Sequence, residues 1–212
     1  MSSIVKVDTI QDTQGNNIIN ESSDTITIGA SGDTISIPSG ATITNSGTAN
    51  GFGGGKIGQV VSATLTGTFT SNSDSMVDIT GLTAAITPAA TSSKVLVMVN
   101  FHVGGTVNDR YAVFQLLRGS TAICIGDAAS SRSRGSAAHV RITATGTQNE
   151  ILTKSISFLD SPSSSSEQTY KMQGLNQSDN DPSFTINRSG NDTDAAHGFR
   201  LASTITLMEV LA

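Results

Sequence analysis

A repeat of short strand patterns between Asp24 and Thr44 constrains the fold more than any other feature of the sequence. The stretch reads DTITIGASGDTISIPSGATIT, in which isoleucine alternates with threonine or serine and the units are separated by segments that contain glycine, proline or serine. Alternation with a period of two gives a β-strand one apolar and one polar face, and the turn residues end each strand early. The repeat therefore predicts very short strands, and no repeat unit can cover its own apolar face.

Recurrence of this unit favours a solenoid-like coil of strands. A segment this small, with open strand edges, is not expected to be stable alone. Two arrangements would cover the isoleucines: three chains wound together as a shaft, or a β-meander packed on the rest of the chain. We favour the homotrimeric, intertwined shaft. Its predicted axis consists of Ile26, Ile28, Ile35, Ile37 and Ile43.

Composition shifts divide the chain into four parts. Gly-Phe-Gly-Gly-Gly at residues 51–55 predicts a flexible joint. The predicted parts are a leading segment (1–23) that docks on a partner or caps the shaft, the β-repeat shaft (24–50), a glycine hinge (51–56) and a C-terminal domain (57–212). The last part is long enough for one sizeable core.

The C-terminal domain is predicted to be all-β. Charged residues make up 14% of the chain and aromatic residues 4%, whereas serine, threonine, glycine and asparagine are abundant, a composition that disfavours long helices. Strand patterns follow one another over 58–70, 75–79, 94–103, 110–117, 121–125, 137–144, 150–159, 169–173, 183–187 and 198–211. Hairpin turns are expected at Arg118–Ser120 and Ser189–Asn191. Antiparallel strands in this number favour a jelly-roll-like β-sandwich.

Two of these strands are apolar on both faces. The strand at 94–103 carries Leu96 and Met98 opposite its valines, and the last strand carries Met208 and Val210 opposite Ile205 and Leu207. Either loops cover the second face or another subunit does. We favour a subunit interface formed by Leu96, Met98, Met208 and Val210, because the repeat already predicts a multimer.

No catalytic motif stands out, and we expect no enzyme activity, cofactor or bound metal. Paired-histidine zinc motifs and a Gly-x-Ser-x-Gly elbow are absent from the sequence, and His139 is expected on the wet face of its strand. Cys124, between two isoleucines, is interpreted as a buried apolar residue. The acidic balance, a net charge of -5, argues against nucleic acid as a partner, and the pair Arg132 and Arg134 is too small to change that.

Oxygen-rich loops at 176–182 and 189–197 are the best binding candidates. Asp and Asn are the usual turn residues, so plain polar turns are the simplest interpretation, but such loops also suit a hard cation or a polar surface glycan. The predicted ligand-binding residues are Asp179, Asn180, Asp181, Asn191, Asp192, Asp194 and His197. The chain has no apolar run long enough for a membrane span, and we expect no membrane insertion.

The residues from Val5 to Phe52, with DTI(T/S)I(G/P)-type repeats ending in Asn-Gly-Phe, resemble the N-terminal region of tail-fibre and related virion proteins of marine bacteriophages. The ending Ala202–Val210 is similar to the last strand of their small β-sandwich tips. The resemblance implies a homotrimer located in the virion and assembled in the host cytoplasm. It also implies an N-terminus bound to other virion proteins and a C-terminal knob that meets the host surface.

Three hypotheses follow. The first is a phage structural protein: a short trimeric tail fibre or fibre adaptor, or alternatively a head fibre or capsid decoration protein. Its C-terminal knob would bind the host surface or a virion partner. The second is a glycan-cleaving tail-spike tip, which would need two facing carboxylates. The third is a cellular lectin or adhesin. We favour the first.

Overall fold

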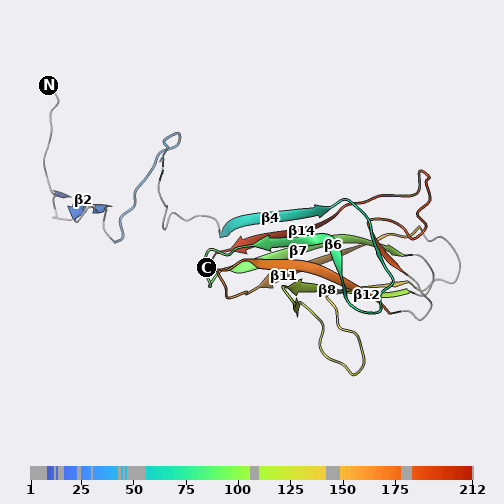
Figure 1. The fold of residues 1–212 in the computed structure, drawn as a ribbon. Coiled ribbons are helices and arrows are strands. Elements are labelled where there is room, and N and C mark those ends of the chain that lie inside the picture. Colours follow the sequence, from blue (N-terminus) through green and yellow to red (C-terminus); the bar gives the residue numbers. More distant parts are fainter. Residues whose placement is uncertain are drawn as a thin grey trace. The chain divides into compact units, whose positions relative to one another are not determined.

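The computed structural model describes residues 9–11, 13, 17–22, 25–29, 31–42, 44, 46, 56–105, 110–141, 149–177 and 183–211. The chain divides into two compact units, Met1–Phe52 and Gly53–Ala212, and the division falls inside the predicted glycine hinge. Every regular element among the described residues is a β-strand (Figure 1). The predicted all-β class is therefore confirmed.

The N-terminal unit contains a three-stranded antiparallel sheet. Its strands are β1 (Thr9–Gln11), β2 (Asn17–Ser22) and β3 (Thr25–Ile28), paired in that order. The first repeat unit forms β3, and it pairs with β2 rather than with the next repeat. The predicted boundary between residues 23 and 24 thus separates two paired strands, because a short strand pairs with the nearest neighbour that a tight turn can supply.

The second repeat unit differs from the expectation. Residues 33–38, which include Ile35 and Ile37, are described but form no strand in the single chain. A strand this short needs a hydrogen-bonded neighbour to persist, and none of the described strands pairs with it.

The C-terminal unit is a sandwich of two antiparallel sheets. The first sheet has the order β4 (Ile57–Leu65), β14 (Ser203–Val210), β7 (Lys94–Gly105) and β11 (Leu152–Asp160). Short β13 (Phe184–Ile186) pairs with the C-terminal end of β7, and β5 (Phe69–Ser71) pairs with β13. The second sheet has the order β6 (Val77–Ile86), β12 (Gln168–Asn176), β8 (Arg110–Arg118) and β10 (Ala137–Arg141), and β9 (Thr121–Ile123) also pairs with β8.

This strand order is that of a jelly roll. The chain passes from one sheet to the other between β5 and β6, β6 and β7, β7 and β8, β10 and β11, β11 and β12, and β12 and β13. The result is a six-stranded and a five-stranded layer in which neighbours are mostly distant in sequence, as two nested Greek keys require. The prediction of a jelly-roll-like antiparallel β-sandwich is confirmed.

The core lies between the two sheets, where alternate residues of each strand point inward. Phe114 is at its centre and packs edge-on against Phe101 and Phe184, with ring centroids 5.1 and 5.2 Å away. Such edge-to-face pairs contribute beyond their buried area. Gly174 of β12 makes room for them, because a Cβ there would lie 2.8 Å from Phe184 and 3.0 Å from Phe114.

Three local predictions were wrong. Strand β9 ends at Ile123, and Cys124 has φ of 52°, which does not fit an extended strand. Ser189–Asn191 is no hairpin turn, because it opens a long connection from β13 to β14. His139 is buried and not on a wet face, because its register partner is the core residue Ala112. Alternation alone does not decide which of two faces is inward.

Candidate functional site

The outward face of the first sheet carries an apolar row that crosses all four long strands. In register, Val60 of β4 lies beside Met208 of β14, Met208 beside Leu96 of β7, and Leu96 beside Leu159 of β11. Directly opposite residues in antiparallel strands have their side chains in contact range. The four therefore form one band across the sheet, which we call the apolar band.

Further apolar side chains widen this band. Met98 lies two residues from Leu96 on the same face of β7, and Val210 pairs with Ile57 beyond Met208. Val60 remains 56% exposed and Leu159 46% exposed in the single chain. A contiguous apolar patch on a soluble domain marks an interaction surface more often than a lone exposed side chain does.

The structure thus brings together all four predicted interface residues, Leu96, Met98, Met208 and Val210. Sequence reasoning missed Val60, Leu159 and Ile57, which complete the same surface. Val60 and Ile57 belong to β4 and Leu159 belongs to β11, and only the cross-strand register reveals that they meet the others.

The rest of the same face is polar. Two rows further along the strands, Thr64, Thr204, Asn100 and Ser155 lie side by side, and the Ser155 hydroxyl donates to Asn100 Oδ1 at 2.5 Å. His102 Nδ1 and Thr153 Oγ1 are 2.9 Å apart beyond that row. Because the same face of the sheet also carries this polar row, the apolar band is a local feature and not a property of the whole face.

The predicted shaft isoleucines lack cover within the described chain. Ile10, Ile19 and Ile28 lie in one cross-strand row of the N-terminal sheet, and all three are exposed. Ile26 is 67% and Ile35 59% exposed, and Ile28 and Ile37 are also exposed. Ile43 lies outside the described residues. Whether these side chains meet at a trimer axis stays a prediction.

The loop predicted to bind a ligand is held by internal contacts. Residues 187–202 connect β13 to β14 at the end of the sandwich opposite the C-terminus (Figure 1). Asp192 accepts a hydrogen bond from Arg200 and lies 3.9 Å from Arg188 Nε. The hydrogen bond from Arg200 lowers the pKa of the Asp192 carboxyl, and this ion pairing ties Asp192 to its own loop.

The other predicted ligand residues of this loop are Asn191, Asp194 and His197. Asn191 accepts hydrogen bonds from Ser189 and Thr193 through its carbonyl oxygen. Asp194 and His197 are exposed on the same loop. Asp179, Asn180 and Asp181 lie outside the described residues. Among the described residues, no three His, Cys, Asp or Glu side chains are close enough to hold a metal ion together.

Asn187 fixes the position where this loop leaves the sandwich. The residue is buried with φ of 64°, a conformation that asparagine tolerates better than most residues. Its side-chain amide donates to the carbonyls of Leu65 (2.7 Å) and Gly67 (2.9 Å), and its Oδ1 accepts from Ser203 at 2.5 Å. These contacts give Asn187 a structural role at the base of the loop.

Two buried carboxylates are likewise structural. Asp160 accepts hydrogen bonds from Arg118 (2.6 Å) and Tyr170 (2.7 Å) and so joins the two sheets. Burial, followed by the hydrogen bond to Asp160, raises the pKa of the Tyr170 hydroxyl above its ordinary range. Burial also acts to raise the pKa of Glu209, but hydrogen bonds from Gln59, the Ala89 N–H and Ser93 outweigh it and leave that pKa lowered.

No protein-family model matches the chain, and no curated protein matches it. Among solved structures, the chain is similar to a mutant VP2 protein of infectious bursal disease virus from derived T=1 particles, with 11% identity and a TM-score of 0.38. It is also similar to a structure of the Gx strain of that virus, with 12% identity and a TM-score of 0.38. Each match covers 73% of this chain.

The chain spans about a third of the length of these solved chains, 36% and 37%. The jelly-roll assignment rests on the strand order of the chain itself. In the described part of the chain, no helix is long and apolar enough to span a membrane.

Proposed function

We propose that the chain is a structural protein of a virus particle, and that it works as a homotrimer: a short bacteriophage tail fibre or fibre adaptor. Its N-terminal part binds other virion proteins, and its jelly-roll knob binds a host-surface glycan without cleaving it. The particle is assembled in the host cytoplasm. The fibre-like repeats and the jelly-roll fold support this proposal.

The observation that carries the proposal is the apolar band of Val60, Met208, Leu96 and Leu159. In one chain it faces outward, and burying it against sister chains would remove its side chains from water. At about 25 cal/mol per Å² of apolar area, burial of such a band contributes several kcal/mol before the cost of association is subtracted. The exposed isoleucine row of the N-terminal sheet supplies a second surface of the same kind.

The mass of the full chain in solution tests the proposal. Light scattering is expected to give three times the 21.8 kDa mass of one chain. Lysine placed at both Val60 and Leu159 is expected to shift the protein towards monomer, because burying an unpaired charge in an interface is costly. A stable monomer of the unmodified chain would overturn the trimer.

A matched control keeps the added charge but moves it off the band. Thr64→Lys with Ser155→Lys changes the same two strands in the polar row of the same face. This variant is expected to keep the trimer mass. If both double variants lose it equally, the apolar band is not the interface.

A head fibre or capsid decoration protein would share this architecture, since the repeat region is short. Locating the chain in intact particles by electron microscopy separates the two: density at the tail supports the fibre, and density at the capsid surface supports the decoration protein.

A further inference from the structure

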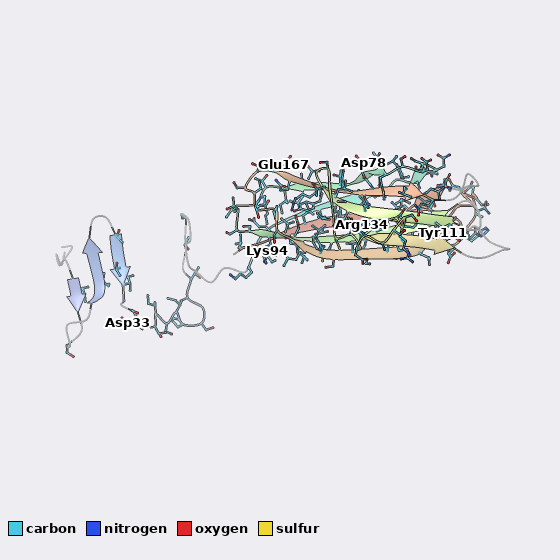
Figure 2. The ribbon with its side chains drawn as sticks, turned by 90° about the horizontal axis from the view of Figure 1, so that it is seen from below. Asp33, Asp78, Lys94, Tyr111, Arg134 and Glu167 are labelled. Atoms are coloured by element: carbon cyan, nitrogen blue, oxygen red, sulfur yellow. The ribbon has the colours of Figure 1, made fainter. Side chains whose placement is uncertain are left out.

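A cavity of about 520 Å³ lies under the loop that follows β9. Residues 124–136 leave β9, stand away from the second sheet and return to start β10; Figure 1 shows this loop projecting from the strands. The cavity is lined from the sheet by Val113, Ala137 and Ala138, and from the loop mainly by Asp127, Arg132 and Arg134. Figure 2 places Arg134 on the side of the sandwich seen from below.

The base of this loop is fixed to the sheet. The Ser136 N–H donates to the carbonyl of Phe114 at 2.8 Å, and the Ser136 hydroxyl accepts from the Leu116 N–H at 3.0 Å. Gly135 lets the loop backbone lie close to β8, because a Cβ at this position would lie 2.5 Å from Val113 Cγ1. These contacts hold the cavity open in the unbound chain, so a ligand would not have to order the base of the loop.

Two arginines give the cavity a positive lining. Arg134 Nε donates to the carbonyl of Gly126 at 2.6 Å, and Gln115 donates to the Arg134 carbonyl at 2.7 Å, which orients Arg134 within the loop. No described carboxylate forms an ion pair with Arg132 or Arg134. Asp127, which also lines the cavity, forms no ion pair with a described residue.

The lining fits one class of ligand. The guanidinium fork binds a carboxylate in bidentate fashion, while Asp127 and the loop serines suit hydroxyl groups. Val113, Ala137 and Ala138 provide a small apolar surface for the C–H face of a sugar ring. The volume lies within the range of small-molecule sites, about 300–1,000 Å³, and the net charge of -5 disfavours a long polyanion such as nucleic acid.

We propose that this cavity binds an acidic sugar unit, with its carboxylate on Arg132 and Arg134. The inference rests on the proposed function, because it names the glycan chemistry that the knob recognises. The cavity belongs to the second sheet and the apolar band to the outer face of the first, so trimer formation through the band leaves the cavity accessible.

Calorimetric titration of the full chain tests the proposal with three oligosaccharides of equal length: one of uronic acid units, one of neutral sugars and one of sulfated neutral sugars. The uronic acid oligosaccharide is expected to bind at least about tenfold more tightly than the neutral one, a difference that one or two charge-assisted hydrogen bonds supply. Preferential binding of the sulfated probe would overturn the carboxylate assignment, and equal binding of all three would overturn the site.

Arg132→Gln is the decisive variant, because its side chain makes no described ion pair whose loss would disturb the loop. It is expected to weaken uronate binding about tenfold or more, whereas Lys56→Gln removes an exposed positive charge elsewhere and is expected to leave binding unchanged. Equal losses in both variants would mean that only overall charge matters. The mass of each variant is measured as well. A variant that loses binding but keeps the oligomer mass shows an effect on the cavity alone. A monomeric unmodified chain refutes the proposed function instead of the cavity.

Discussion

Among single residues, Asp160 links the two sheets, because its buried carboxylate on one sheet accepts hydrogen bonds from side chains of the other. Replacing it with alanine would leave Arg118 and the Tyr170 hydroxyl without their acceptor. Because hydrogen bonds to charged groups contribute about 1.5–3 kcal/mol each, we expect Asp160→Ala to lower the free energy of unfolding by a few kcal/mol. Denaturant titration measures this loss.

Asp78 offers the matched control. It pairs with Lys171 at 2.8 Å, but on the surface, and exposed pairs contribute about 0.2–1 kcal/mol. Asp78→Ala should therefore cost clearly less than Asp160→Ala. Equal costs would mean that the buried contact adds nothing beyond a surface ion pair.

Glu209 makes the stability of the knob depend on pH. The residue is 1% exposed, and its hydrogen bonds hold the folded-state pKa of its carboxyl below the ordinary value of 4.5. A depressed folded pKa means that the contribution is fully present above pH 4.5 and is lost as pH falls through the folded pKa. We expect Glu209→Gln to lower the melting temperature at neutral pH and to have a smaller effect well below pH 4.5. A constant difference across that range would contradict the assignment.

At the scale of elements, strand existence was predictable and strand ends were less so. Alternating patterns located most strands of the sandwich, because the jelly roll gives each strand one inward face. Strand β6 was predicted only to Ile79 but continues to Ile86. Gly81 interrupts the alternation there with φ of 89°, and the sequence reads as a turn although the chain continues as a bulged strand.

Gly174 tests how tightly the two sheets pack. Gly174→Ala places a Cβ where Phe184 and Phe114 already approach within 2.8 and 3.0 Å. Overpacking a filled core typically costs about 1–3 kcal/mol, and we expect a loss of that size in chemical denaturation.

Gly67→Ala is the control at this scale. The nearest atom to a Cβ there is the end of the Leu65 side chain at 4.0 Å, so little change is expected. If Gly174→Ala has the same free energy of unfolding as Gly67→Ala, Phe114 and Phe184 can rearrange around the added methyl group without loss of stability.

For the whole molecule, the candidate surfaces were only partly predictable. Two adjacent strands with apolar residues on both faces pointed to Leu96 and Met208, but the register that adds Val60 and Leu159 comes from pairing between distant segments. The cavity under residues 124–136 was not predictable either. Its arginines are two residues apart in a polar loop, and only the fold sets them over an apolar floor.

The N-terminal isoleucines allow the trimer to be tested apart from the knob. If sister chains cover Ile35, then Ile35→Asp buries an unpaired charge and should lower the trimer fraction or the temperature at which the trimer dissociates. Ser36→Asp adds the same charge to the adjacent position, on the opposite side of an alternating strand, and should leave both unchanged. Light scattering over a range of temperatures measures them. Identical behaviour of the two variants would show that the repeat does not form the trimer axis and would leave the apolar band of the knob as the association surface.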